Sequence, residues 1–137
     1  MGNFVREFFN IETIEHPKLN TLNEILEILQ DDYLNLLAKN YNLDGTIQRN
    51  KLIDSLKFAI LTQFRNKIIN FSVAEHKSFN EFYQGAVDYS DENVYINLKK
   101  FTGLGILFLF TVNEGQLYSF KIPDEIITIY EELLQSV

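Results

Sequence analysis

The sequence predicts a mainly α-helical domain of the α+β class, with one C-terminal β-hairpin and a final helix. Two apolar runs, 106–112 and 116–122, are separated by Asn113, Glu114 and Gly115, a pattern typical of a hairpin. Pro123 ends the second run, because proline has no N–H for a strand ladder. The segments on both sides of the hairpin carry apolar residues at helical spacing.

Length and composition predict one domain over 1–137, made of an N-terminal helical unit, 1–47, and a core, 48–137. An apolar share of 46% in 137 residues is ample for a packed core. The absence of cysteine excludes disulfides and thiolate chemistry, and two histidines leave little for a metal site, so we expect no cofactor. No signal peptide and no membrane-length apolar run is found, which predicts a cytoplasmic protein without a membrane partner.

Capping residues and periodicity place the helices of the first half. A turn is expected at His16-Pro17, and the capping box of Thr21 with Glu24 starts a helix. Asp31 or Asp32 can start the next helix, up to residue 40. A long helix follows from about Gln48, with a buried stripe of Leu52, Ile53, Leu56, Ile60 and Phe64. Three apolar residues outside this stripe predict that the helix is covered on more than one side: Phe58, Leu61 and Ile69.

The second half contains three further helix starts. A capping box of Ser78 with Glu81 predicts one helix, and Ser90 predicts another that runs to about residue 101 with Asn97 facing outward. Asp124 opens the last helix. Its predicted apolar stripe consists of Ile126, Ile129, Tyr130, Leu133 and Leu134.

The order of three helices and a hairpin over 50–122 resembles the winged-helix domain, with the hairpin as the wing. Residues 31–56 look like the small helix-turn-helix unit of Rho N-terminal and SAP-type segments, through shared apolar positions and a turn at 41–43. The residues that carry this second likeness are Leu34, Leu37, Ala38, Lys51, Leu52, Ile53 and Leu56. Both resemblances imply nucleic-acid contact in many members, and neither implies catalysis.

The net charge of −7 is unevenly distributed along the chain. Residues 1–38 hold seven acids and two bases, whereas residues 39–70 hold two acids and six bases. This basic belt is either a solvated helix face or a nucleic-acid contact surface. The candidate contacts are Lys39, Arg49, Lys51, Lys57, Arg65 and Lys67, with Lys99 and Lys100 from a later helix.

The expected DNA-reading edges of a winged helix carry the wrong charge for that role. The third helix begins with Asp91 and Glu92 and the hairpin tip has Glu114, and all three would meet phosphate with like charge. We therefore favour a non-catalytic protein-interaction module, with a regulatory or inhibitory role, that uses an acidic aromatic surface. A nucleic-acid-binding transcriptional regulator that uses the belt is the alternative. The candidate partner contacts are Phe4, Phe8, Tyr89, Asp91, Glu92, Tyr95 and Glu114, with Phe4 and Phe8 also able to dock a second copy.

No catalytic or metal constellation is predicted. Adjacent carboxylates on a helix point about 100° apart and cannot act as a dyad. Glu12, Glu15 and His16 flank a proline turn, and side chains placed in this way rarely converge on one ion. We expect these three residues to belong to a solvated loop, and we do not expect an enzyme.

Overall fold

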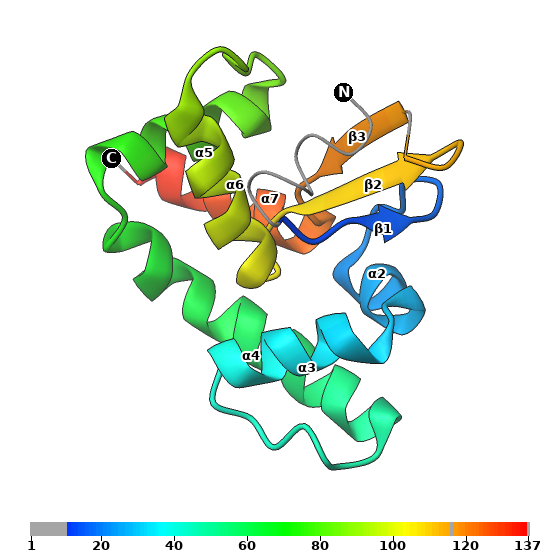
Figure 1. Ribbon diagram of the computed structural model, residues 1–137. Helices are drawn as coiled ribbons and strands as arrows, with labels where there is room; N and C mark the ends of the chain where they lie inside the picture. The colour runs from blue at the N-terminus through cyan, green and yellow to red at the C-terminus, as the bar shows by residue number, and fades with distance from the viewer. Residues whose placement is uncertain (1–10, 116, 137) are drawn as a thin grey trace.

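The computed structural model describes residues 11–115 and 117–136 and confirms a mainly helical α+β fold with a small sheet and a C-terminal helix (Figure 1). The elements of this part of the chain, in order, are β1 (Ile14–Glu15), α2 (Leu22–Ile28), α3 (Asp31–Asn40), α4 (Arg49–Ile69), α5 (Val73–Gln84), α6 (Glu92–Gly103), β2 (Phe108–Val112), β3 (Leu117–Lys121) and α7 (Asp124–Gln135).

The predicted hairpin is present as β2 and β3, with shorter strands than expected. The two strands pair antiparallel, with Phe108 opposite Lys121 and Thr111 opposite Tyr118. The turn between them uses left-handed backbone at two non-glycine residues, Asn113 with φ 54° and Glu114 with φ 58°. Strand β2 reads as a continuous apolar run because it is buried between neighbours on both faces.

The structure contains a short strand that the sequence did not predict. Residues Ile14 and Glu15 form β1, which pairs parallel to β2 with Ile14 opposite Phe110. The backbone N–H of His16 donates to the carbonyl of Thr111 at 3.1 Å, and the chain then bends before Pro17, as expected. A strand of two residues is too short to show an alternating pattern, so only the bend was visible in the sequence.

The junction between α6 and β2 is fixed by three side chains from α3 and its C-terminal cap. The hydroxyl of Tyr33 donates to the carbonyl of Thr102 at 2.8 Å, and the amide of Asn40 donates to the carbonyl of Gly103 at 2.7 Å. The hydroxyl of Tyr41 donates to the carbonyl of Leu104. The last carbonyls of a helix have no intrahelical partner, so these donors satisfy the end of α6 and set the direction in which the chain enters β2.

Helix α7 is held against α2 by contacts between their N-terminal ends. Both carboxylate oxygens of Glu125 accept from the backbone N–H of Leu22, at 3.0 and 3.2 Å. The backbone N–H of Asp124 donates to the carbonyl of Asn20 at 2.9 Å. One carboxylate therefore serves the N-terminal turn of a helix more than 100 residues earlier in the chain.

Two predicted helix starts are wrong: the cap of α5 lies six residues before Ser78, and the cap of α6 lies one residue after Ser90. Helix α5 begins after Ser72, which forms the capping box with Glu75. Ser78 is buried inside α5, where its hydroxyl lies 2.8 Å from the side-chain amide of Asn97. Asn97 is therefore buried rather than outward, and it lies on the face that α6 turns toward α5. Helix α6 is capped by Asp91, whose carboxylate accepts from the Asn93 N–H.

The prediction that α4 is covered on more than one side is wrong at two of the three positions that suggested it. The side chains of Phe58 and Ile69 are 71% and 66% exposed, whereas Leu61 packs partly against the core. The predicted buried stripe of α4 is confirmed. On α7, Ile126 and Tyr130 are buried as predicted, but Leu134 is exposed. The resemblances to winged-helix and SAP-type units stay predictions.

Gly105 lies where the chain leaves α6, and both its backbone and its surroundings require glycine. Its φ is +68°, and a Cβ atom there would lie 2.8 Å from Cδ1 of the buried Ile60. Gly85 has a similar φ of +72° but open space around it. We expect Gly85→Ala to cost about 1 kcal/mol of unfolding free energy, and Gly105→Ala to cost about 2 to 4 kcal/mol because the clash adds to the backbone strain. Urea unfolding of the two variants measures the difference, and equal losses would contradict this account of the junction.

Removal of the Tyr33 hydroxyl tests the anchoring of α6. Tyr33→Phe should lower the unfolding free energy by about 1 to 2 kcal/mol, because a buried hydrogen bond is lost. The matched control is Tyr83→Phe, which deletes the same atom from an exposed bond to Glu131 and should change stability by less than about 0.5 kcal/mol. Thermal and urea unfolding should rank the two variants in this order; a Tyr33 variant as stable as the control would remove the anchoring role.

Candidate acidic binding cleft

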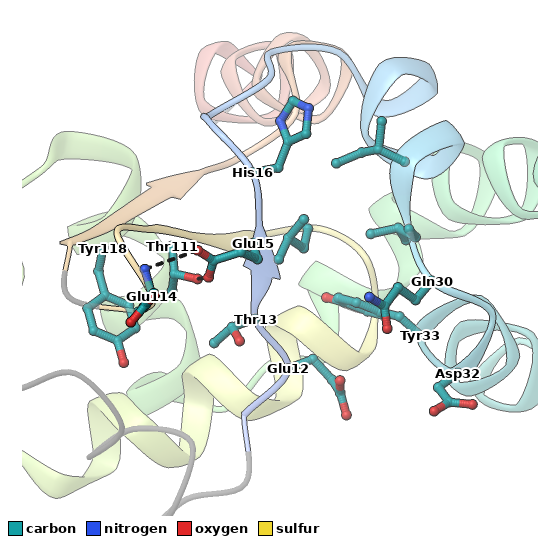
Figure 2. A pocket seen from close by; sticks show the side chains of 14 residues that line it. Glu12, Thr13, Glu15, His16, Gln30, Asp32, Tyr33, Thr111, Glu114 and Tyr118 are labelled. Atoms are coloured by element: carbon teal, nitrogen blue, oxygen red, sulfur yellow. Dashed lines mark hydrogen bonds between the residues drawn. The ribbon is translucent and has the colours of Figure 1, made fainter.

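A cleft of about 300 Å³ lies along β1, bounded by the α2–α3 junction on one side and by the β2–β3 turn on the other (Figure 2). Four carboxylate side chains line it: Glu12, Glu15, Asp32 and Glu114. Among the described residues that line the cleft there is no lysine or arginine. Ile28, Leu29 and two tyrosines, Tyr33 and Tyr118, give it apolar walls.

Glu15 is placed by the register of β1 on β2. It lies opposite Thr111, whose buried hydroxyl donates to the Glu15 carboxylate at 2.8 Å. The other carboxylate oxygen accepts from the backbone N–H of Glu114 at 3.2 Å. Figure 2 shows Glu15 pointing toward Thr111 and the hairpin turn, away from Gln30 and Tyr33. This carboxylate therefore ties the turn to β1 as well as contributing charge to the cleft.

The other carboxylates come from three separate parts of the chain. Glu12 precedes β1, Asp32 is exposed in the first turn of α3, and Glu114 is exposed at the hairpin tip. Asp32 also complements the dipole of α3, which is its ordinary structural role. Within the described residues, neither Glu12 nor Glu114 takes part in an ion pair. The cleft thus gathers negative charge that the neighbouring elements do not neutralise.

Tyr33 lies between the cleft and the core. Its hydroxyl is fully engaged with the carbonyl of Thr102, and its ring lies 5.9 Å from that of Phe108. Burial, and to a smaller extent the charge of Glu12, raises the pKa of the Tyr33 phenol well above its ordinary value. The phenol stays neutral and acts as an aromatic wall.

Of the predicted partner contacts that the structure describes, Glu114 alone lines this cleft. Tyr89 stacks on Phe120 at a ring distance of 6.0 Å, and Tyr95 is buried with its hydroxyl donating to the Tyr89 carbonyl. Asp91 caps α6, and Glu92 is exposed in its first turn. Of the predicted acidic aromatic surface, Glu114 lies at the hairpin tip and the other described members lie at or near the start of α6. Phe4 and Phe8 lie outside the described residues.

Glu12 and His16 lie outside regular secondary structure, as expected, whereas Glu15 is exposed but belongs to β1 rather than to a loop. The sequence did not predict that all three line one cleft. Sequence reasoning missed this because it depends on β1, which has no recognisable pattern. The described residues contain no group of three or more histidine, cysteine, aspartate or glutamate side chains arranged to hold a metal ion. Figure 2 shows His16 above the cleft, and its Nδ1 atom lies 2.6 Å from the Pro17 carbonyl oxygen.

Three of the six residues of the predicted basic belt have structural partners. Arg49 pairs with Asp31 at 2.8 Å and also donates to the carbonyls of Glu27 and Leu29 at the end of α2. Arg65 pairs with Glu132. Lys67 lies over the ring of Tyr41, with its ammonium 4.9 Å from the ring centre. Within the described residues, neither an ion pair nor a cation–π contact is found at the other three, Lys39, Lys51 and Lys57.

The two lysines of α6 differ in their surroundings. Lys99 is exposed, whereas the Lys100 ammonium lies 2.6 Å from the Glu75 carboxylate and 5.2 Å from the centre of the Phe71 ring. Burial alone would raise the pKa of Glu75, but hydrogen bonds from Lys100 and Ser72, with the charge of Lys100, outweigh it and lower that pKa. Lys100 is therefore partly neutralised by α5.

Comparison with known proteins gives no match: no protein-family model, no curated protein and no solved structure matches this chain. Across the described residues, no helix combines the length and the hydropathy needed to cross a membrane.

The lowered pKa of Glu75 predicts a pH dependence of stability. Because the pKa is lower in the folded chain, Glu75 stabilises the fold fully above its unfolded pKa of about 4.3, and this contribution is lost as the pH falls through the folded pKa. Glu75→Gln should therefore lower the urea midpoint at about pH 7 and have little effect at about pH 2 to 3. Glu92→Gln, which changes an exposed acid on α6, serves as the control with a small effect at both pH values. An equal loss at both pH values for Glu75→Gln would contradict the role of its charge.

Proposed function

We propose that this protein is a non-catalytic binding module that holds a basic segment of another protein in the acidic cleft. The observation that supports the proposal is that Glu12, Glu15, Asp32 and Glu114 all line one concave surface whose described lining contains no lysine or arginine. Concave surfaces lined by one sign of charge focus the field and attract ligands of opposite charge. Peptide segments rich in lysine and arginine have this charge.

The walls of the cleft suit the stems of basic side chains. Lysine and arginine bury their methylene chains along apolar surface while the charged end remains near water. Ile28 is half-buried at the cleft and offers part of such a surface, while the buried Leu29 and Tyr33 form its apolar floor. The chemistry of the lining therefore supports a ligand that is both basic and long, rather than a small inorganic cation.

Charge alone gives this cleft selectivity rather than high affinity. An exposed ion pair contributes about 0.2 to 1 kcal/mol, so four carboxylates supply only a few kcal/mol at low salt. The remainder of the affinity must come from the methylene stems of the ligand's basic side chains and from contacts of the ligand's backbone with the cleft. Electrostatic complementarity mainly accelerates association and excludes acidic partners.

A regulatory or inhibitory role follows from the same chemistry. Proteins that bind nucleic acid do so with lysine and arginine side chains. A partner whose basic segment occupied this cleft could not use that segment on phosphate. The module would then act by competition, without a chemical step of its own. Two of the cleft's features support a binding role over catalysis: both Glu15 oxygens are hydrogen-bonded, and the Tyr33 hydroxyl is engaged with Thr102.

Fluorescence anisotropy tests the proposal with a labelled peptide of about ten residues in which lysine and arginine alternate with serine and glycine. The parent protein should bind this peptide at about 20 mM NaCl and more weakly at about 150 mM NaCl, because salt screens exposed charge. Glu12→Gln combined with Asp32→Asn should weaken binding by about threefold to tenfold at low salt.

The matched control is Glu92→Gln combined with Asp54→Asn, which removes the same charge from exposed positions on α6 and α4. This pair should bind the peptide like the parent. If it loses as much affinity as the cleft pair, the peptide responds only to net charge and the cleft has no special role. A parent protein that binds no basic peptide at low salt, or binds a glutamate-rich peptide equally well, refutes the proposal.

A further inference from the structure

A second charged hollow lies where the C-terminal ends of α3, α4 and α6 meet. It consists of two adjoining shallow depressions, both widely open to solvent, which share Lys100 and Leu104. We call their joint surface the basic groove and define it by its three lysines, Lys67, Lys99 and Lys100. Its described lining contains no aspartate or glutamate, which makes it the electrostatic opposite of the acidic cleft.

The lysines of the groove come from different helices and two of them are held in place. Lys67 lies over Tyr41 and Lys100 lies over Phe71, and both rings are buried. A cation held against an aromatic ring loses less rotamer freedom when it binds a ligand. Lys99 is exposed on α6. The groove therefore presents two ammonium groups placed over aromatic rings and one on an exposed side chain.

The carbonyl groups at the C-terminal ends of these helices carry partial negative charge, and nearby side chains that donate hydrogen bonds to them reduce it. Asn40 donates to the carbonyl of Gly103, and Tyr41 donates to the carbonyl of Leu104. At the end of α4, the side chain of Asn70 donates to the carbonyl of Asn66 at 2.8 Å. Among the three groove lysines, Lys100 forms an ion pair, with Glu75 of α5. Lys67 and Lys99 consequently supply most of the unpaired positive charge.

From these observations we propose that the basic groove binds the phosphate backbone of a single-stranded nucleic acid. The ligand class follows from shape as well as charge. Duplex DNA is read by an element that protrudes into its groove, whereas the lysines here line shallow depressions between helix ends. A hollow lined by cations admits a single strand and follows its backbone. The carboxamides of Gln63 and Asn66 add polar groups able to contact phosphate and sugar.

The proposed site differs from the basic belt of the sequence. Arg49 and Arg65 are held by Asp31 and Glu132, so they lack the unpaired charge that phosphate would require. Lys57 precedes Lys67 by ten residues, which corresponds to about 15 Å along α4. Of the belt, only Lys67 lines the groove, where Lys99 and Lys100 join it from a helix more than 30 residues later. Binding should therefore depend on Lys67 and Lys99 and be insensitive to Lys51 and Lys57.

Fluorescence anisotropy with labelled oligothymidylate of about 20 nucleotides tests this site. With about three phosphates neutralised, the slope of log K against log salt should be about −2, so the affinity should fall about 50-fold between about 20 and about 150 mM NaCl. Lys67→Gln combined with Lys99→Gln should reduce the slope to about −0.7 and weaken binding at low salt by at least about tenfold.

The matched control pair is Lys51→Gln with Lys57→Gln, which removes two charges from α4 outside the groove and should bind like the parent. Lys99→Gln alone, at an exposed position, tests the site without disturbing the contact of Lys67 with Tyr41, and it should reduce the magnitude of the slope by about 0.7. Loss of binding in the groove variants alone supports the proposal. It is overturned if oligothymidylate does not bind at about 20 mM NaCl, if the control pair loses as much affinity, or if duplex DNA or a poly-glutamate peptide binds more tightly.

Discussion

The hydrogen bonds from α3 to the end of α6 are the constraint on which the arrangement of this domain depends. Tyr33, Asn40 and Tyr41 satisfy three successive carbonyls, Thr102 to Leu104, just before the chain turns at Gly105 into the buried strand β2. Because β2 is buried along almost its whole length, a change in its entry direction would disturb both neighbouring strands and the helices packed on them. The same tyrosines also take part in the two charged surfaces. Tyr33 forms a wall of the acidic cleft, and the ring of Tyr41 lies under Lys67 in the basic groove.

Sequence periodicity was sufficient for the elements whose own residues determine them. The α4 stripe, the Thr21 capping box and the hairpin turn all depend on neighbours within a few residues, and the structure has them. Asn97, Phe58 and β1 were not predictable in this way, because each depends on a distant segment. Asn97 is buried because Ser78 provides a partner, Phe58 is exposed because no described element covers it, and β1 is a strand only because β2 lies beside it.

Charge along the chain is a poor guide to charge on the folded surface. Folding neutralises part of the basic run 39–70, because both of its arginines form ion pairs, Arg49 with Asp31 of α3 and Arg65 with Glu132 of α7. The acidic N-terminal stretch is divided: Asp31 pairs with Arg49, whereas Glu12 and Asp32 line the same cleft as Glu114 from the other end of the sequence. Concave sites of opposite sign can therefore coexist in a protein of net charge −7, because a Debye length of about 8 Å isolates their local fields.

The pairing of β1 with β2 has a consequence for the order in which the domain matures. Glu15 and Thr111 are separated by 96 positions, and a contact with such a large sequence separation forms only after the intervening chain has been organised. During synthesis, the N-terminal wall of the cleft emerges long before the strand and turn that complete it. A nascent chain therefore carries the carboxylates of Glu12 and Glu15 without the geometry of the cleft, which is complete only when translation has passed the hairpin.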